Sequence, residues 1–415
     1  MTEKKKLMLI CPMLHQGGME KVCVATARAL TLYFDITIVI FNSADIAFDV
    51  EGLHIIDIKL GAKPGKLRKI LNIVKRSVKV RGLKKQLKPD VAYSFGPTAN
   101  MVNAFSKTGK EQVWLGLRSY EDVNECVKIR LFNPLADLMV CCSKEIEWVL
   151  KVKYGFKKTT VLYNPFDVEK IRASAEDSKP VLPWDEEENS EGMCAEETNS
   201  EKIRCFISMG REDDVKGFWH MLKAFSLVHK KAPYSRLILM GDGSFDEYKK
   251  LAADLGVEKA VYFPGMQRNP YPYLGRAHIY LLASRVEGFP NALVEGMAAG
   301  LVPLAVNCLS GPAEILTEKE TAASLNTWFE KQVAEGEKPV RYGEYGVLIP
   351  SLSPEKNLNA FEISQEERAL AETMLSLLED EELAKRYRKT GAERAGIFTF
   401  THYVERILQM AGVRE

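Results

Sequence analysis

Residues 277–300 constrain the fold of this chain more than any other stretch. An apolar run at residues 277–283 is followed by a polar turn that contains Glu287 and Gly288. After the turn, apolar residues recur at helical spacing until Gly300. A change from a continuous apolar run to helical spacing, with glycine at the end, predicts a strand, a turn and a helix.

The start of this helix is a candidate anion site. Pro290 suits the first helical turn because its missing N–H has no intrahelical partner there. The free amides of residues 289–292 then lie at a helix N-terminus, which attracts phosphate. Glu287 would lie in the loop and Glu295 about one turn into the helix, so the two carboxylates can reach opposite ends of one elongated molecule. A diphosphate between two hydroxyl-rich rings fits, and two solvated glutamates are the plain alternative.

Length and composition set the frame for this unit. A chain of 415 residues, 46% of them hydrophobic, is long enough for two domains with separate cores. Its eight cysteines form no CxxC pair, which is typical of reduced thiols in a cytoplasm and indicates no structural metal. The sequence has no run of eighteen apolar residues, so we expect no segment that spans a membrane.

Charge divides the chain into two unequal halves. Residues 1–165 carry 27 Lys and Arg against 15 Asp and Glu, whereas residues 166–415 carry 30 against 41. We therefore expect the two halves to face different partners.

The first half alternates strand and helix patterns. Apolar runs at residues 7–11, 34–41 and 54–58 are typical of strands, and Gly17-Gly18 opens a helix after the first of them. This alternation predicts a parallel sheet. Glycines at a helix start let the backbone approach a ligand closely, although a plain tight turn explains two glycines equally well.

A strongly basic segment lies between Lys59 and Asp90. It holds twelve basic residues and no acidic one. Residues at i, i+3, i+4, i+7 and i+11 form one apolar helical face, namely Leu67, Ile70, Leu71, Val74 and Val78. Two interpretations stay open, a helix that packs this face on the core or a helix that docks on anionic lipid. Nucleic acid is a weaker alternative because no aromatic residues are interleaved with the basic ones.

A third biased segment is acidic. From Glu176 to Glu201, ten acidic residues meet one lysine among interspersed Pro, Gly, Asn and Ser. Such a composition cannot bury a core, so it predicts an elongated and flexible insertion between domains.

The stretch from Glu287 to Gly300, followed by residues 308–316 (CLSGPAEIL), resembles the donor-site signature of retaining nucleotide-sugar glycosyltransferases of family four. These enzymes have the two-Rossmann (GT-B) architecture. The resemblance implies that Glu287 contacts the transferred sugar and that Glu295 binds the ribose hydroxyls. It also implies that the intervening loop holds the sugar and the diphosphate, through Gly288, Phe289, Pro290 and Asn291.

The resemblance extends to two further loops. Gly210-Arg211 and Lys216-Gly217 are similar to the family's diphosphate clamp, which implies that Arg211 and Lys216 neutralise the leaving nucleotide without a metal or another cofactor. The Gly17-Gly18 turn resembles the family's N-terminal glycine loop beside the diphosphate and the acceptor. The turn Gly241-Asp242-Gly243 lacks the third glycine of a dinucleotide fingerprint, which argues against NAD.

One position departs from the family pattern. A histidine often follows the strand that ends near residue 95, whereas this chain continues with Gly96-Pro97-Thr98-Ala99-Asn100. Thr98 and Asn100 are the nearest candidates to contact the sugar or acceptor in its place. Arg118, in a loop after another strand, is a third candidate because open α/β sheets bind ligands at the C-terminal ends of their strands.

The resemblance therefore predicts an α/β chain with two facing Rossmann-like domains and an active site in the cleft between them. We expect an acceptor-side and membrane-facing domain at residues 1–167 and the acidic insertion at residues 168–202. A donor-nucleotide domain follows at residues 203–395, and a final helix at residues 396–415 crosses back to the first domain.

The predicted function is transfer of a hexosyl or N-acetylhexosaminyl group from a UDP-sugar to a saccharide or polyprenyl-linked acceptor, in bacterial surface polysaccharide or glycan synthesis. We expect the protein to be cytoplasmic and peripheral on the inner face of the plasma membrane, attached to anionic lipid through the basic segment. Two alternatives are a sugar-nucleotide-binding scaffold with weak turnover, which the missing histidine favours, and a UDP-sugar epimerase.

Overall fold

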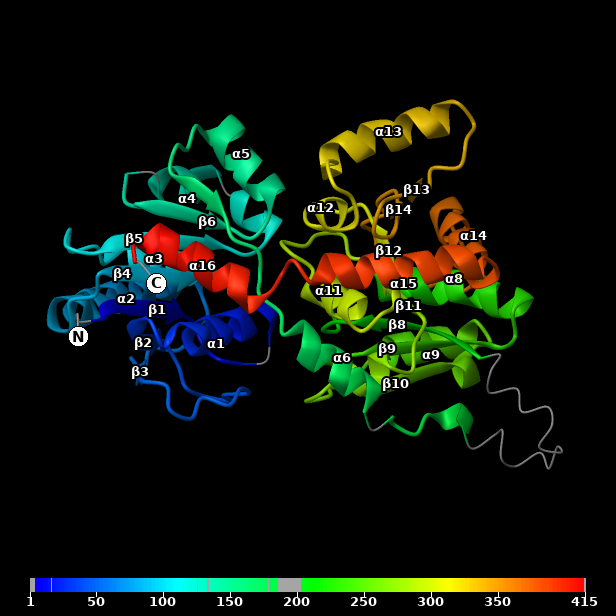
Figure 1. Cartoon of the computed structure of the whole chain (residues 1–415), viewed down its shortest axis with the longest axis horizontal. Helices are drawn as coiled ribbons and strands as arrows, with labels where there is room; N and C mark the ends of the chain where they lie inside the picture. Colours follow the sequence, from blue (N-terminus) through cyan, green and yellow to red (C-terminus); the bar gives the residue numbers. More distant parts are fainter. Residues whose placement is uncertain are drawn as a thin grey trace. The chain divides into compact units, whose positions relative to one another are not determined.

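A computed structural model describes residues 4–15, 17–124, 126–132, 134–177, 179–185 and 203–413. The chain divides into two compact units (Figure 1). The first comprises residues 1–166 and 398–415, and the second comprises residues 167–397. Each unit contains its own sheet and core, so each is described separately.

The first unit is built on a seven-stranded sheet with the order β3-β2-β1-β4-β5-β6-β7. Every paired strand in it is parallel. The alternating strand and helix patterns of the sequence therefore form crossover connections, as parallel strands require. The strands are β1 (Lys5–Cys11), β2 (Phe34–Ile40), β3 (Ile55–Asp57), β4 (Val91–Phe95), β5 (Gln112–Leu117), β6 (Leu138–Cys141) and β7 (Thr159–Val161).

Helices cover both faces of this sheet. One core cluster joins alternate strand residues to α1 (Gly18–Leu30) and α16 (Phe400–Ala411). A second cluster, on the other set of strand residues, includes side chains from α2 (Lys66–Leu87) and α3 (Pro97–Phe105). The remaining helical segments of the unit are η1 (Tyr120–Val123), α4 (Cys126–Phe132) and α5 (Lys144–Tyr154). The last helix of the chain thus completes the core of the first unit.

The second unit repeats this plan, with the strand order β10-β9-β8-β11-β12-β14-β13. All pairs are parallel except β13 with β14. The strands are β8 (Arg204–Met209), β9 (Ser235–Met240), β10 (Val261–Gly265), β11 (Ile279–Leu282), β12 (Val302–Val306), β13 (Arg341–Tyr342) and β14 (Val347–Ile349). The predicted α/β class with two Rossmann-like domains is confirmed.

The main core cluster of the second unit packs α8, α9, α14 and α15 with the strands. The helical segments of this unit are α6 (Val168–Glu176), η3 (Asp214–Lys216), α8 (Phe218–Lys231), α9 (Asp246–Asp254), η4 (Glu258–Ala260), α10 (Tyr271–Leu274), α11 (Asn291–Ala298), α12 (Pro312–Leu316), α13 (Ala322–Ala334), α14 (Gln365–Glu379) and α15 (Glu381–Ala395).

The structure differs from the predicted insertion at residues 168–202. Its first part forms α6, which packs against α10 and α11 of the second unit, and the side chains of Leu182 and Trp184 are buried. Gly275 of the second unit approaches the Ala175 backbone so closely that an added Cβ would lie 1.8 Å from its carbonyl oxygen. The acidic stretch begins at Glu176, where α6 ends, so its composition gave no information about this helix. Residues 186–202, the centre of the predicted flexible segment, lie outside the described residues.

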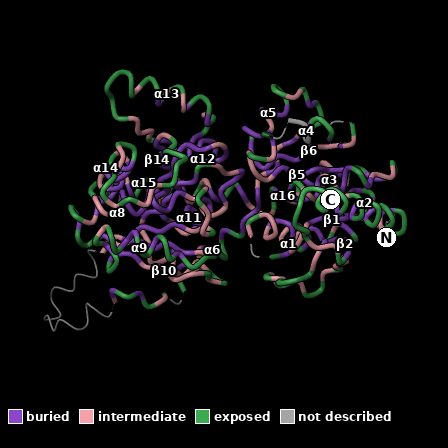
Figure 2. The backbone as a smooth tube through the Cα atoms, turned by 180° about the vertical axis from the view of Figure 1, so that it is seen from behind, coloured by how far each residue is buried: buried purple, intermediate pink, exposed green. Residues whose placement is uncertain are grey.

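The basic segment forms α2, but its faces are reversed relative to a core-packed helix. The five apolar residues of the predicted face are all exposed, with exposed fractions of 78% for Leu67, 60% for Ile70, 58% for Leu71, 54% for Val74 and 67% for Val78. In Figure 2, much of this helix is coloured as exposed residues. The interpretation that this apolar face packs on the core is therefore wrong.

The side of α2 that faces the unit is instead largely polar. Asn72 donates a hydrogen bond to the Gly61 carbonyl at 2.8 Å, and Arg76 donates to the Leu60 carbonyl at 2.8 Å. The Arg76 guanidinium also lies 4.4 Å from the ring centre of Phe41. Long side chains can bury their aliphatic stems against a core while their ends find carbonyls. This is why a polar helix face packs here.

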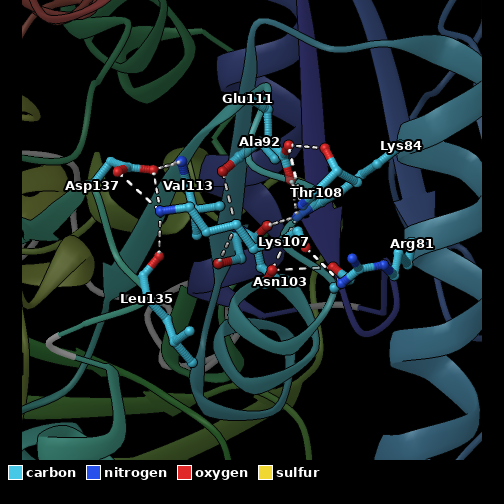
Figure 3. A network of polar contacts seen from close by, with 12 residues as sticks. Arg81, Lys84, Ala92, Asn103, Lys107, Thr108, Glu111, Val113, Leu135 and Asp137 are labelled. Carbon is cyan, nitrogen blue, oxygen red and sulfur yellow. Dashed lines mark hydrogen bonds and ion pairs between the residues drawn. The ribbon is translucent and has the colours of Figure 1, made fainter.

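A buried network fixes the C-terminal half of α2 (Figure 3). The Lys84 ammonium lies 3.1 Å from the Glu111 carboxylate, and the two side chains are 0% and 1% exposed. Lys84 also donates to the Asn103 side-chain oxygen at 2.7 Å, while Thr108 hydrogen-bonds to Glu111. Burial lowers the pKa of Lys84 to about 8, although Glu111 opposes this shift. The network ties α2 to α3 and to the start of β5.

No helix among the described residues is long and apolar enough to cross a bilayer.

We predict that Glu111→Gln destabilises the first unit by about 3–5 kcal/mol, because it leaves the buried Lys84 ammonium without its counter-charge. Denaturant unfolding followed by domain-resolved hydrogen exchange measures the loss. Asp49→Asn is the matched control, since Asp49 pairs with Arg28 at 2.8 Å with exposed side chains. It should cost less than about 1 kcal/mol. Equal stability of the two variants would contradict a stabilising role for the buried pair.

Candidate active site

The candidate site lies at the C-terminal ends of β8 and β11. These strands are neighbours in the sheet, but β8 leads to β9 on one side and β11 leads to β12 on the other. The chain after each strand therefore diverges and leaves a crevice between two loops. Open α/β sheets bind ligands at this kind of topological switch point.

An ion pair joins the two loops at this point. The Lys216 ammonium, at the end of η3, lies 2.7 Å from the Glu287 carboxylate in the loop after β11. The side chains are 25% and 13% exposed, so solvent reaches the pair. The structure thus brings together two of the three residues that the sequence predicted as catalytic.

Backbone contacts hold the two loops in register. The Arg285 amide donates to the Val215 carbonyl at 2.8 Å, and an added Cβ at Gly217 would lie 2.4 Å from the Ala283 carbonyl oxygen. Gly217 also has φ +64°, which disfavours other residues. A Cβ on Gly210 would lie 3.2 Å from the Lys216 stem. The glycines on either side of the Lys216 turn therefore permit the close approach of loop and strand.

The loop after β12 clasps the Glu287 loop from its other side. The Glu287 amide donates to the Leu309 carbonyl at 2.9 Å, and the Ser310 amide donates to the Glu287 carbonyl at 3.0 Å. The Ser310 hydroxyl donates to the Gly288 carbonyl at 3.0 Å. Gly311 has φ +109°, and a Cβ there would lie 2.5 Å from Pro290. Both backbone groups of Glu287 are thus fixed, which positions its carboxylate.

The helix α11 follows directly, as predicted. It begins at Asn291, with Pro290 at the N-cap position. Gly288, Phe289 and Pro290 are buried, whereas Asn291 is half-buried. Glu295, one turn further along, is 6% exposed. The predicted donor-binding residues on this element therefore form one continuous loop and helix start.

Burial keeps two groups beside this site neutral, the Tyr280 hydroxyl and the Cys308 thiol. Burial raises the pKa of the Tyr280 hydroxyl well above its usual value, and the carboxylates of Glu295 and Glu287 add to this shift, although a hydrogen bond from the Met209 amide opposes it. Burial also raises the pKa of the Cys308 thiol, again with a contribution from Glu287. Neither group therefore carries charge near neutral pH.

Arg211 is placed differently from Lys216. Its side chain is 67% exposed, and its guanidinium lies 4.0 Å from the Asp213 carboxylate. Among the contacts of the described residues, it does not join the pair of Lys216 and Glu287. Its role as the second cation stays a prediction.

Some residues that support the site carried no recognisable sequence signal. Lys356, from the segment after β14, lies 2.9 Å from Asp214, the first residue of the turn that carries Lys216, and it also pairs with Glu247. Gly241, at the end of β9, has φ +148°, and a Cβ there would lie 1.8 Å from the Gly210 carbonyl oxygen. This glycine is thus required by strand packing. In the sequence, the Ser-Gly-Pro run at residues 310–312 was the feature that could have indicated the contact between this loop and the Glu287 loop.

Five predicted site residues belong to the first unit. Gly17 precedes α1 as its N-cap residue and Gly18 begins it. Thr98 lies half-buried in the first turn of α3. Asn100 is fully buried, and its amide donates to the Gly116 carbonyl at 2.8 Å while its side-chain oxygen accepts from Ser94 at 2.7 Å. Its side chain therefore holds β4 and β5 together.

Arg118 also makes contacts inside the first unit. Its guanidinium donates to the Asn164 side chain at 2.9 Å and to the Tyr93 hydroxyl, and it lies 4.9 Å from the ring centre of Phe95. The Nε atom is buried and has no hydrogen-bond partner. These contacts give Arg118 a structural role, and its predicted contact with sugar or acceptor stays untested.

Within the described part of the chain, no group of three or more His, Cys, Asp or Glu side chains is arranged to hold a metal ion.

Comparison with known proteins finds similarity to glycosyltransferases. Residues 193–336 match the family described as "Glycosyl transferases group 1". The chain is 26% identical to an uncharacterized glycosyltransferase of Methanocaldococcus jannaschii over 349 residues, which cover 79% of this chain and 80% of that protein. It is 24% identical to a Campylobacter jejuni N-acetylgalactosaminyltransferase that acts on a diphospho-undecaprenol-linked sugar, over 80% of this chain and 89% of that protein.

Solved structures agree on the fold. An Anabaena protein crystallised with UDP and glucose superposes with a TM-score of 0.69 at 16% identity, covering 98% of this chain and 99% of that one. A glycosyltransferase of Rickettsia africae superposes with a TM-score of 0.71 at 15% identity, covering 98% of each chain. The predicted GT-B architecture is confirmed.

We predict that Gly217→Ala destabilises the second unit by about 2 kcal/mol or more, because it adds a steric clash with Ala283 to the cost of a left-handed backbone. Gly256→Ala is the matched control, since Gly256 has φ +70° and no atom within 4 Å of an added Cβ. The control should cost only about 1 kcal/mol. Chemical unfolding measures both, and equal losses would show that the two loops are free to separate.

Proposed function

We propose that this chain, which has the GT-B fold and is similar to glycosyltransferases, transfers a hexosyl or N-acetylhexosaminyl group from a UDP-sugar to a saccharide or lipid-linked saccharide, with retention of configuration. The observation that carries this proposal is the pair of Lys216 and Glu287 at the switch point of the second sheet. The pair sets a cation for a diphosphate beside a carboxylate for sugar hydroxyls.

The proposed roles follow from charge and position. Lys216, with Arg211, neutralises the charge that develops on the departing UDP, and the amides at the start of α11 hold the diphosphate. Glu287 accepts hydrogen bonds from the sugar and orients it. Glu295, further along α11, binds the ribose hydroxyls. Two cations and a helix N-terminus supply the positive charge that the diphosphate needs, so we propose that no metal is required.

The proposed chemical step is a same-face substitution at the anomeric carbon. The bond between this carbon and the phosphate oxygen breaks, and a bond to the acceptor hydroxyl oxygen forms on the same face. The acceptor proton moves to the departing phosphate oxygen, so UDP leaves with the electron pair and the proton. The protein groups thus position and neutralise the reactants more than they attack them.

The acceptor class is proposed from the relatives and from charge. The Campylobacter jejuni relative is named for a lipid-linked acceptor, and others are named for lipopolysaccharide core or poly(glycerol-phosphate) synthesis. The first half of this chain carries the excess positive charge. We therefore propose a role in bacterial surface polysaccharide or glycan synthesis, with the first unit docked on the anionic inner face of the plasma membrane.

We predict that Lys216→Ala and Glu287→Ala each lower kcat at least about a hundredfold, because groups that stabilise developing charge contribute about 3 kcal/mol. The assay follows UDP release and glycosylated product from a panel of UDP-sugars, with and without chelator. Lys249→Ala is the control, since its side chain is exposed on α9.

Each outcome of this assay is informative. Wild-type rates in both variants would show that the site assignment is wrong. Conversion of the donor sugar without any acceptor would indicate an epimerase, and donor binding without turnover in the wild type would indicate a scaffold. Loss of activity with chelator would contradict the metal-independent mechanism.

We predict that replacing four exposed basic residues of α2, namely Lys66, Arg68, Lys69 and Lys75, with glutamine weakens binding to phosphatidylglycerol vesicles at low salt by at least about tenfold. Each surface cation contributes about 1 kcal/mol to such binding. Co-sedimentation measures the effect, which should shrink as salt shortens the Debye length. Replacing Lys230, Lys231, Lys250 and Lys259 of the second unit, which are also exposed, is the charge-matched control. Equal losses in both variants would contradict docking through α2.

A further inference from the structure

The segment between α12 and β13 is bonded to the end of a strand that serves the candidate site. This segment, residues 317–340, contains α13, which lies beside α12 (Figure 1). Asn307, the first residue after β12, is 0% exposed. Its side-chain amide donates to the Ala322 carbonyl at 2.9 Å and to the Asn326 side-chain oxygen at 2.8 Å. Both amide hydrogens of Asn307 are therefore bonded to the start of α13.

The backbone of Asn307 is fixed as well. Its amide donates to the Ile349 carbonyl at 2.8 Å, and its carbonyl accepts from the Ser351 hydroxyl at 2.8 Å. The Cys308 amide donates to the Val306 carbonyl at 2.9 Å, a bond that closes a three-residue turn centred on Asn307. The chain therefore leaves β12 in a tight turn whose central residue is held by α13, by β14 and by the segment after β14.

This turn directs the chain to the Glu287 loop. The two backbone groups of Glu287 bond to Leu309 and Ser310, which follow Asn307 closely in the sequence. Val286 and Leu309 also form an isolated parallel β-bridge. Because the chain between them is so short, a change in backbone direction at Asn307 would displace both groups that hold Glu287.

The attachment of α13 does not depend on Asn307. Leu325 and Phe329 of this helix are 0% and 3% exposed. Thr321 and Ser324 form a capping box at its start. Burial of an apolar face supplies most of the stability of a helix in a folded protein. The bonds from Asn307 are therefore available to orient the end of β12.

The side-chain oxygen of Asn307 supports the same interpretation. This atom is buried and has no hydrogen-bond partner in the described part of the chain. A buried acceptor without a donor costs stability. Departures from full hydrogen bonding are expected at functional sites, where direction matters more than stability.

We propose that Asn307, oriented by α13, is a positioning residue for Glu287. This inference rests on the proposed function, in which Glu287 binds the transferred sugar. Lys216, the cation proposed for the diphosphate, lies on a different loop, whose backbone is bonded to Arg285. Loss of the Asn307 side chain should therefore affect sugar binding more than diphosphate binding.

The first test compares UDP with the UDP-sugar that the wild type binds best from a panel, by calorimetry on the full chain. We expect Asn307→Ala to weaken binding of the UDP-sugar at least about tenfold, since small misplacements of a contact group are costly, and binding of UDP less than about threefold. Asn326→Ala, which removes one of the two acceptors in α13, should give a smaller loss of the same kind. Thr327→Ala is the matched control, because Thr327 is exposed on α13 and its hydroxyl bonds to the Ala323 carbonyl. It should change neither affinity.

The double variant with both asparagines replaced should lose no more than Asn307→Ala alone, because residues in one hydrogen-bond network are not additive. Equal losses of UDP and UDP-sugar binding would show that Asn307 supports only the fold, and the proposal would fail. If Asn307→Ala does not fold, Asn326→Ala decides the question, since it keeps Asn307 in place and removes only one of its partners.

The second test needs no donor. In hydrogen exchange of the ligand-free full chain, we expect the amides of Glu287 and Ser310 to exchange at least about tenfold faster in Asn307→Ala than in the wild type. Amides of residues 213–217 should keep their rates. Unchanged exchange at residues 287 and 310 would overturn the positioning role even in an active enzyme. A wild type that neither prefers a UDP-sugar to UDP nor transfers sugar would defeat the proposed function, whereas faster exchange in the variant would still show that Asn307 holds this loop.

Discussion

The strand order of the second sheet is the constraint on which the candidate site depends. Because β8 and β11 are neighbours whose following segments turn to opposite sides, two loops meet across one crevice. Their close approach needs glycine at position 217, where any Cβ would meet the Ala283 carbonyl, and the loop after β12 needs glycine at position 311 to pack beside Pro290 of the Glu287 loop. Once the loops are this close, a lysine on one and a glutamate on the other reach hydrogen-bonding distance at 2.7 Å. The approach of Lys216 to Glu287 thus follows from the strand order and from the two glycines at positions 217 and 311.

The pair of Lys216 and Glu287 also suits the proposed donor site. A lone ammonium and a lone carboxylate in a partly shielded crevice would each lack a partner, and a charge taken from water without one is costly. Pairing them removes that cost while both stay 13–25% exposed to arriving ligand. A diphosphate would offer the lysine a stronger anion, and sugar hydroxyls would offer the glutamate donors. If the proposed donor binds here, exchange of partners would let it enter without leaving either charge unpaired.

How far the sequence predicts this structure differs between the two units. In the second unit, ordered motifs with glycine at defined positions predicted the strand, loop and helix around Glu287, because those residues act through local backbone geometry. Contacts between residues distant in sequence could not be predicted, such as the ion pair of Lys356 with Asp214 in the turn that carries Lys216. In the first unit, periodicity predicted the helix α2 and its apolar face, but it did not predict that this face points to solvent. Asn100 and Arg118 were candidates for ligand contact, yet their side chains bond within the unit.

The sequence of α2 alone could not show which of its faces points to the core, because that depends on hydrogen-bond partners elsewhere in the chain. Helical spacing shows that one face is apolar, and a core is the usual destination of such a face. In this helix the side that faces the core carries Arg76 and Lys84 instead. Their partners lie in the loop after β3, at the end of α3 and before β5. Burial of the lysine lowers its pKa to about 8, as expected for an ammonium group that has lost contact with water. Because a buried charge without a partner is costly, the hydrogen bonds of Arg76 and Lys84 offset the cost of placing them in the core. The same contacts leave the apolar face of α2 exposed, so its polar core-facing side and its exposed apolar face follow from one set of contacts.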